Sequence, residues 1–192
     1  MNGLRVRVVL VAGLLMAGLS VASFGNVAVG QAPAAGSAAS EAAAPGILTR
    51  EQAGAILPAS VFYRGQSATV QARNSSGIRL AGGRLVLAAV VDTGGYSTAV
   101  QQTYQAYLIT EVPLKLGEEV LAPGAYGFGF VAGDRMVVMD VGGNEILHAK
   151  TVHDSKLARP NPLQIVADAG APGHYRLYMG RVYVSLAPAP KQ

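Results

Sequence analysis

Residues 122–141 read "APGAYGFGFVAGDRMVVMDV" and carry much of the information about the fold. Pro123 and Gly124 suit the second and third positions of a type II turn, because proline fixes φ and glycine tolerates a positive φ. If Gly133 and Asp134 form the next turn, the flanking segments pair as a hairpin with one apolar face. The predicted pairs are Phe130 with Val137, Phe128 with Met139, and Tyr126 with Val141.

The opposite face of this hairpin carries Gly127 and Gly129. Glycines inside a strand indicate that another backbone or a large side chain approaches closely. An alternative is that this face lines an apolar cavity.

A second copy of the A-P-G-x-Y pattern, "APGHYRLYM", occupies residues 171–179. Gly180 and Arg181 then suit a glycine-first, two-residue turn. The turn pairs Tyr175 with Leu186, Leu177 with Val184, and Met179 with Val182, and it puts His174, Arg176, Tyr178, Tyr183 and Ser185 on the other face. We therefore interpret A-P-G-x-Y as a turn that begins an antiparallel strand, with its tyrosine as the first core-facing residue.

The rest of the chain predicts one helix and further short strands. Thr49 and Gln52 form a capping-box pattern, which predicts a helix over 50–56. A turn at Gly65-Gln66 would put Val61, Tyr63, Ala68 and Val70 on one face. Strands are expected at 84–92, at 103–110 with Tyr104, Ala106 and Leu108 on one side, at 145–152 after a turn at 142-143 or 143-144, and at 163–167. The fold class is all-β, an antiparallel β-sandwich or partly closed barrel of about nine or ten strands with one short N-terminal helix.

The N-terminus has the layout of a secretory signal peptide. Arg5 and Arg7 precede an apolar run over residues 8–19, and small residues follow. This run is shorter than the ~20 residues of a membrane-spanning helix, so no permanent membrane span is expected after cleavage. Cleavage is expected after Ala22, or as late as Ala32.

Three regions follow from this reading: a signal peptide at 1–22, a flexible Ala/Gly/Pro/Ser-rich segment at 23–46, and a single β-domain at 47–192. The chain has no cysteine, so packing alone must stabilise the domain. We expect an exported protein, periplasmic or extracellular. The small excess of basic over acidic residues, 15 against 11, contains no basic run and predicts no nucleic-acid partner.

The P-G-x-Y turns, Pro123-Gly124 with Tyr126 and Pro172-Gly173 with Tyr175, resemble those of bacterial secreted sandwich modules, including immunoglobulin-like and transthyretin-like accessory domains. The stretches "FYRGQSATVQARNSSG", "VDTGGYS" and "APGAYGFGF" also make the chain similar to uncharacterised exported bacterial β-domain proteins. The resemblance implies a cell-envelope location and a sandwich fold, and it brings no catalytic residues.

Few residues suggest chemistry. His148, His153, Asp154 and His174 are the candidates for a metal site, but the H-x4-H-D spacing matches no common zinc pattern, so neither metal nor cofactor is expected. No G-x-S-x-G or S-x-x-K motif is present. Ser97 and Ser155 are the remaining possible nucleophiles, and no enzyme is expected. Tyr96 and Tyr178 are the expected exposed tyrosines for a ligand surface such as a sugar site.

The leading hypothesis is thus an exported, non-catalytic β-domain that acts in the cell envelope through contacts with a protein or another envelope component. The alternative is a carrier that encloses a small apolar ligand in a barrel, its cavity lined by Gly127 and Gly129. A metal-dependent or serine hydrolase is the third hypothesis.

Overall fold

The computed structural model describes residues 44–190. The predicted signal peptide at 1–22, both candidate cleavage sites, and residues 23–43 of the predicted flexible segment lie outside this range.

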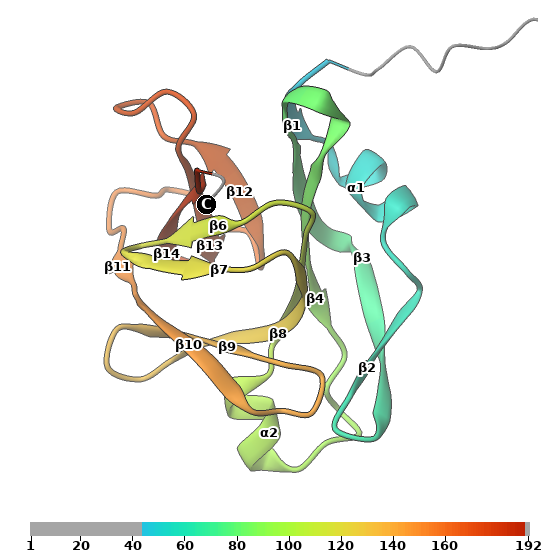
Figure 1. Cartoon of the computed structure of the whole chain (residues 1–192). Coiled ribbons are helices and arrows are strands. Elements are labelled where there is room, and N and C mark those ends of the chain that lie inside the picture. The colour runs from blue at the N-terminus through green and yellow to red at the C-terminus, as the bar shows by residue number, and fades with distance from the viewer. Residues whose placement is uncertain (1–43, 191–192) are drawn as a thin grey trace, which may run out of the picture. The chain divides into compact units, whose positions relative to one another are not determined.

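The described chain forms two antiparallel β-sheets (Figure 1), which confirms the predicted all-β class. The larger sheet has the order β1-β3-β4-β5-β8-β9-β10, with β2 paired to β3, and the smaller sheet has the order β12-β13-β14-β6-β7, with β11 paired to β14. The sheets do not close into a barrel, so the arrangement is that of a sandwich.

The strands of the larger sheet are β1 (Gly46–Leu48), β2 (Ser60–Tyr63), β3 (Gln66–Arg79), β4 (Leu85–Val91), β5 (Ala106–Thr110), β8 (Gly124–Val131), β9 (Arg135–Met139) and β10 (Glu145–Lys150). Those of the smaller sheet are β6 (Leu114–Leu116), β7 (Glu119–Leu121), β11 (Val152–His153), β12 (Gln164–Ala167), β13 (Tyr175–Met179) and β14 (Val182–Pro188).

The sequence predicted fewer strands than the structure has. The additional ones are short: β1, β6 and β7 have 3 residues each, and β11 has 2. Segments of this length contain too few residues to show an alternating pattern, so they could not be predicted from the sequence.

Two helices and a 3₁₀ turn accompany the strands: α1 (Arg50–Ile56), α2 (Thr98–Thr103) and η1 (Ala81–Gly83). The α1 prediction is confirmed, including the capping box, in which Gln52 N donates to Thr49 Oγ1 and Thr49 N donates to Gln52 Oε1. Helix α2 was not predicted, and the strand expected from residue 103 begins only at Ala106. With 7 and 6 residues, α1 and α2 are too short to cross a bilayer, and the described residues contain no longer apolar helix.

The larger sheet is buried on both faces. Alternate residues of β4 belong to two hydrophobic cores: Val86 and Ala88 face the smaller sheet, whereas Leu87 and Ala89 belong to a second core. The second core lies under the helices and β2, and Figure 1 shows α1 and β2 on the side of the larger sheet away from the smaller one. It contains the stacked rings of Tyr63 and Tyr104, 3.9 Å apart, and Tyr96 beside them.

The burial of both faces explains why the predicted register of the β8–β9 hairpin is wrong by one residue. The turn is a three-residue loop with positive φ at Gly133 (83°) and Asp134 (52°), so Val131 pairs with Arg135. The observed pairs are Phe130 with Met136, Phe128 with Val138, and Gly127 with Met139. Of the expected partners, Val137 and Met139 belong to the second core and Val141 is exposed.

The close approach predicted at Gly127 and Gly129 is confirmed. A Cβ at Gly127 would lie 2.8 Å from the Tyr104 ring, and one at Gly129 would collide with the carbonyl group of Thr103. Tyr104 had been expected beside Ala106 and Leu108, but it lies in the second core because α2 ends at Thr103 and turns the chain. The end of α2 therefore fills the space where the ligand-carrier hypothesis placed an apolar cavity.

The β13–β14 hairpin is paired as predicted. Gly180 has a φ of 61°, and Tyr175 pairs with Leu186, Leu177 with Val184, and Met179 with Val182.

The A-P-G-x-Y motif has a different structure in each copy. In the second copy Gly173 has a φ of 79°, and His174 N donates to Ala171 O at 3.0 Å, as expected of a turn. In the first copy Gly124 is already part of β8, paired with Thr110, and its φ is not positive. There the Tyr126 hydroxyl donates to Ala122 O at 3.0 Å, a tyrosine-corner contact that leaves no room for a side chain at Gly124.

Two further turns differ from their predictions. The β2–β3 turn uses Arg64 and Gly65, both with positive φ, instead of Gly65-Gln66, although the predicted face is correct. The loop after β9 is closed by hydrogen bonds from Gly143 N to Asp140 O and from Asp140 N to Asn144 O, so neither two-residue turn considered for it is formed.

Candidate functional site

The outer face of the smaller sheet carries the candidate site, and its polarity follows from strand alternation. In β13 and β14 the residues between the core positions point away from the larger sheet. They pair across the hairpin as Arg176 with Ser185 and Tyr178 with Tyr183, as the sequence predicted.

An ion pair fixes the position of Arg176 on this face. Its Nε and Nη2 atoms donate to the two carboxylate oxygens of Asp168, at 3.2 and 2.9 Å. The side chains are 34% and 19% exposed. Hydrogen bonds from the Gly170 amide and from Arg176 hold the pKa of Asp168 below its ordinary value. The Nη1 atom of Arg176 takes no part in this ion pair.

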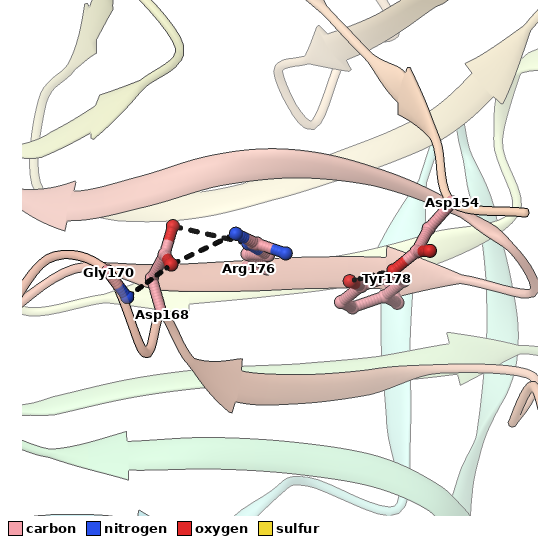
Figure 2. A network of polar contacts seen from close by, with 5 residues as sticks. All are labelled: Asp154, Asp168, Gly170, Arg176 and Tyr178. Atoms are coloured by element: carbon pink, nitrogen blue, oxygen red, sulfur yellow. Dashed lines mark hydrogen bonds and ion pairs between the residues drawn. The ribbon is translucent and has the colours of Figure 1, made fainter. Parts of the chain in front are cut away.

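A second polar pair lies further along the same strand. Tyr178 is buried, and its hydroxyl donates to the carboxylate of Asp154 at 2.9 Å. Burial raises the pKa of Tyr178, and the hydrogen bond lowers the pKa of Asp154. Figure 2 shows the result, a row in which Arg176 and Tyr178 lie between Asp168 and Asp154. Each hydrogen-bonded pair fixes the orientation of its two side chains, so Arg176 and Tyr178 are both held in place.

Tyr183 and a shallow hollow lie beside this row. The guanidinium of Arg176 stands 4.9 Å from the centre of the Tyr183 ring, which packs at 5.0 Å against Tyr178. The hollow has a volume of about 320 Å³ and is open to solvent. Apart from Arg176 and Tyr183, it is lined by consecutive residues of β11 and the following loop, 152–156.

The predicted metal candidates do not form one cluster. His148 lies on β10 of the larger sheet, where its Nε2 is 2.8 Å from Glu145 Oε2. His153 and Asp154 belong to the hollow, and His174 is exposed at the start of β13. Within residues 44–190, no three side chains of the metal-binding types come together.

Within residues 44–190, neither candidate nucleophile lies beside a histidine that a carboxylate orients. Ser155 lies in the hollow next to His153 and Asp154, but the Asp154 carboxylate is occupied by Tyr178 and by the backbone amide of Lys156. Ser97 is the residue before α2. A Ser-His-Asp set requires a carboxylate that accepts a hydrogen bond from the histidine, whereas the Asp154 carboxylate accepts hydrogen bonds from Tyr178 and Lys156.

The expectation that Tyr96 and Tyr178 are exposed is wrong. Tyr96 is 7% exposed, and its hydroxyl reaches the carbonyl oxygens of Tyr63 and Gln66 in the second core. Tyr178 is 3% exposed because the loop after β11 covers it. The half-buried tyrosine beside the hollow is Tyr183. The sequence placed it on the polar face, but its partner at Val152 comes from β11, which was too short to predict.

Comparisons with family models, with curated proteins and with solved structures find no match to this chain.

Proposed function

We propose that the chain is an exported, non-catalytic binding protein of the cell envelope, and that its domain binds through the outer face of the smaller sheet. The observation that carries the proposal is the row of paired polar groups beside the hollow. Binding benefits from groups that are already held in place, because less conformational freedom is lost on association. Catalysis would instead require a group free to exchange a proton with a substrate.

The sequence supports the exported location through its leader-like first 22 residues. The Ala/Gly/Pro/Ser-rich segment that follows would act as a tether between the domain and another envelope component. Cell fractionation and N-terminal sequencing of the processed chain test this part. Recovery of unprocessed protein in the cytosol would contradict it.

Photo-cross-linking in the host cell tests the binding face. A photoreactive benzoylphenylalanine replaces Ser155 in the hollow, and in the matched control it replaces Ser67, an exposed serine of β3 on the larger sheet. We expect a discrete adduct from position 155 and none from position 67. Adducts of equal yield from both positions, or from neither, would refute the proposed binding face.

A further inference from the structure

The hollow beside Tyr183 combines charges that balance. Among the residues that line the hollow, Lys156 and Asp154 carry opposite charges, and Arg176 is paired with Asp168, which lies outside the lining. Arg176 is neutralised by direct contact with Asp168, so no excess charge selects an anion or a cation. The hollow therefore fits a neutral ligand better than a charged one.

The polar groups around the hollow include both donors and acceptors. Among the lining residues, Arg176 and Lys156 carry donors, and the hydroxyl of Ser155 donates and accepts. Each carboxylate oxygen of Asp154 accepts one hydrogen bond within the protein and has a second lone pair for a further one. A sugar hydroxyl also donates and accepts, so a mixed set of this kind can satisfy several hydroxyls at once. A protein partner of ordinary size would need a much wider surface, about 800 Å² on each side.

An aromatic ring completes the arrangement. Tyr183 is half-buried and is held by Tyr178 and Arg176, so little side-chain freedom remains to be lost on binding. Its ring offers apolar contact area next to the polar groups, which matches the C–H and O–H surfaces of a pyranose.

We infer that this hollow binds a neutral carbohydrate, at the scale of one or two sugar units, with Tyr183 as the aromatic contact. This inference rests on the proposed function and names the ligand class for the same face. A protein that docks on the face is the competing outcome of the test.

The test is a titration of the full chain, followed by the backbone amide signals in NMR spectra. The probes are five neutral hexasaccharides, built of β-1,4-glucose, α-1,4-glucose, xylose, mannose and N-acetylglucosamine, with hexagalacturonate as the charged comparison. We expect at least one neutral probe to shift the signals of residues 152–156, 176 and 183 saturably below about 10 mM. The absence of saturable shifts with every neutral probe, or tighter binding of hexagalacturonate, would overturn the inference.

Variants then test the role of Tyr183. Tyr183→Ala should raise the Kd by about tenfold, and Tyr183→Phe, which keeps the ring, by less than about threefold. Phe62→Ala is the matched control, because it removes an aromatic ring that is 57% exposed on β2, and it should leave the Kd unchanged. If Tyr183→Ala unfolds, Ser155→Trp serves instead, because it fills the hollow from an exposed position. An unchanged Kd in the folded hollow variant would refute the site.

The cross-linking result separates the two proposals. A protein adduct from position 155 together with no sugar binding would overturn the carbohydrate inference and support the proposed binding face. If sugar binds and Tyr183→Ala does not weaken the binding, the proposed carbohydrate site is overturned. The cross-linking adducts would still decide the proposed function in that case.

Discussion

The contact between β8 and the end of α2 predicts that Gly129→Ala strongly destabilises the domain. Gly129 is buried, and a methyl group there would collide with the carbonyl group of Thr103. Both sides of this contact are backbone, so a rotamer change cannot relieve it. Gly129 is held by its pairing with Val137 on β9, and Thr103 is held at the end of α2.

The size of the effect follows from the cost of overpacking, about 1–3 kcal/mol for an added methylene in a well-packed interior. We expect the upper half of this range, because backbone must move. For a domain of this size it corresponds to a fall of roughly 4–12 °C in Tm. Urea unfolding of the full chain, followed by circular dichroism, measures the free energy of unfolding directly.

Gly46→Ala is the matched control. Gly46 also lies in a strand, but its added Cβ would have no atom within 4 Å, so a change within about 0.5 kcal/mol is expected. Equal free energies of unfolding for the two variants would refute the packing of α2 against β8.

Three further predictions concern buried or paired polar groups. The buried amide of Ile165 donates to Ser76 Oγ at 3.0 Å, so Ser76→Ala leaves this amide without a partner. Urea unfolding should show a free energy of unfolding lower by about 1–3 kcal/mol, and an unchanged value would contradict the contact between β3 and β12. The hydroxyl of Tyr104 is buried and finds no partner among residues 44–190, so Tyr104→Phe should leave the free energy of unfolding unchanged or raise it. Tyr96→Phe loses hydrogen bonds and should lower the free energy of unfolding by about 1 kcal/mol; the reverse order would contradict the packing of the second core. The lowered pKa of Asp168 means that its ion pair stabilises the fold at neutral pH and that this contribution is lost as pH falls below about 4, through the folded pKa. Asp168→Asn should therefore flatten the dependence of stability on pH in that acidic range, and an unchanged slope would refute the role of the pair.

The two hairpins show what the sequence could and could not predict. In β13–β14 one face is apolar and the other polar, so only one register satisfies both, and the prediction is confirmed. In β9 the run "MVVM" is apolar on both faces, because one core lies on each side of the larger sheet. A slip of one residue there still gives apolar partners, so alternation alone could not fix the register.

The unpredicted elements depend on tertiary contacts. Helix α2 reads "TAVQQT", which is too short to show a helical apolar pattern; its Val100 packs against the second core and its end packs against Gly129. The site was predicted only in part for the same reason. The polar face of β13 and β14 follows from alternation, but the burial of Tyr178 and the lining of the hollow depend on a long-range contact with residues 152–156.

The larger sheet lies between two hydrophobic cores, and this position affects how its amide hydrogens exchange with solvent. In β4, β5, β8 and β9, neighbouring residues are shielded by different layers, so removing either layer leaves the other covering the strand. We therefore expect solvent to reach their amide hydrogens only when the whole domain opens. These four strands should thus form the slowest-exchanging unit, while the short strands at the sheet edges exchange through local fraying.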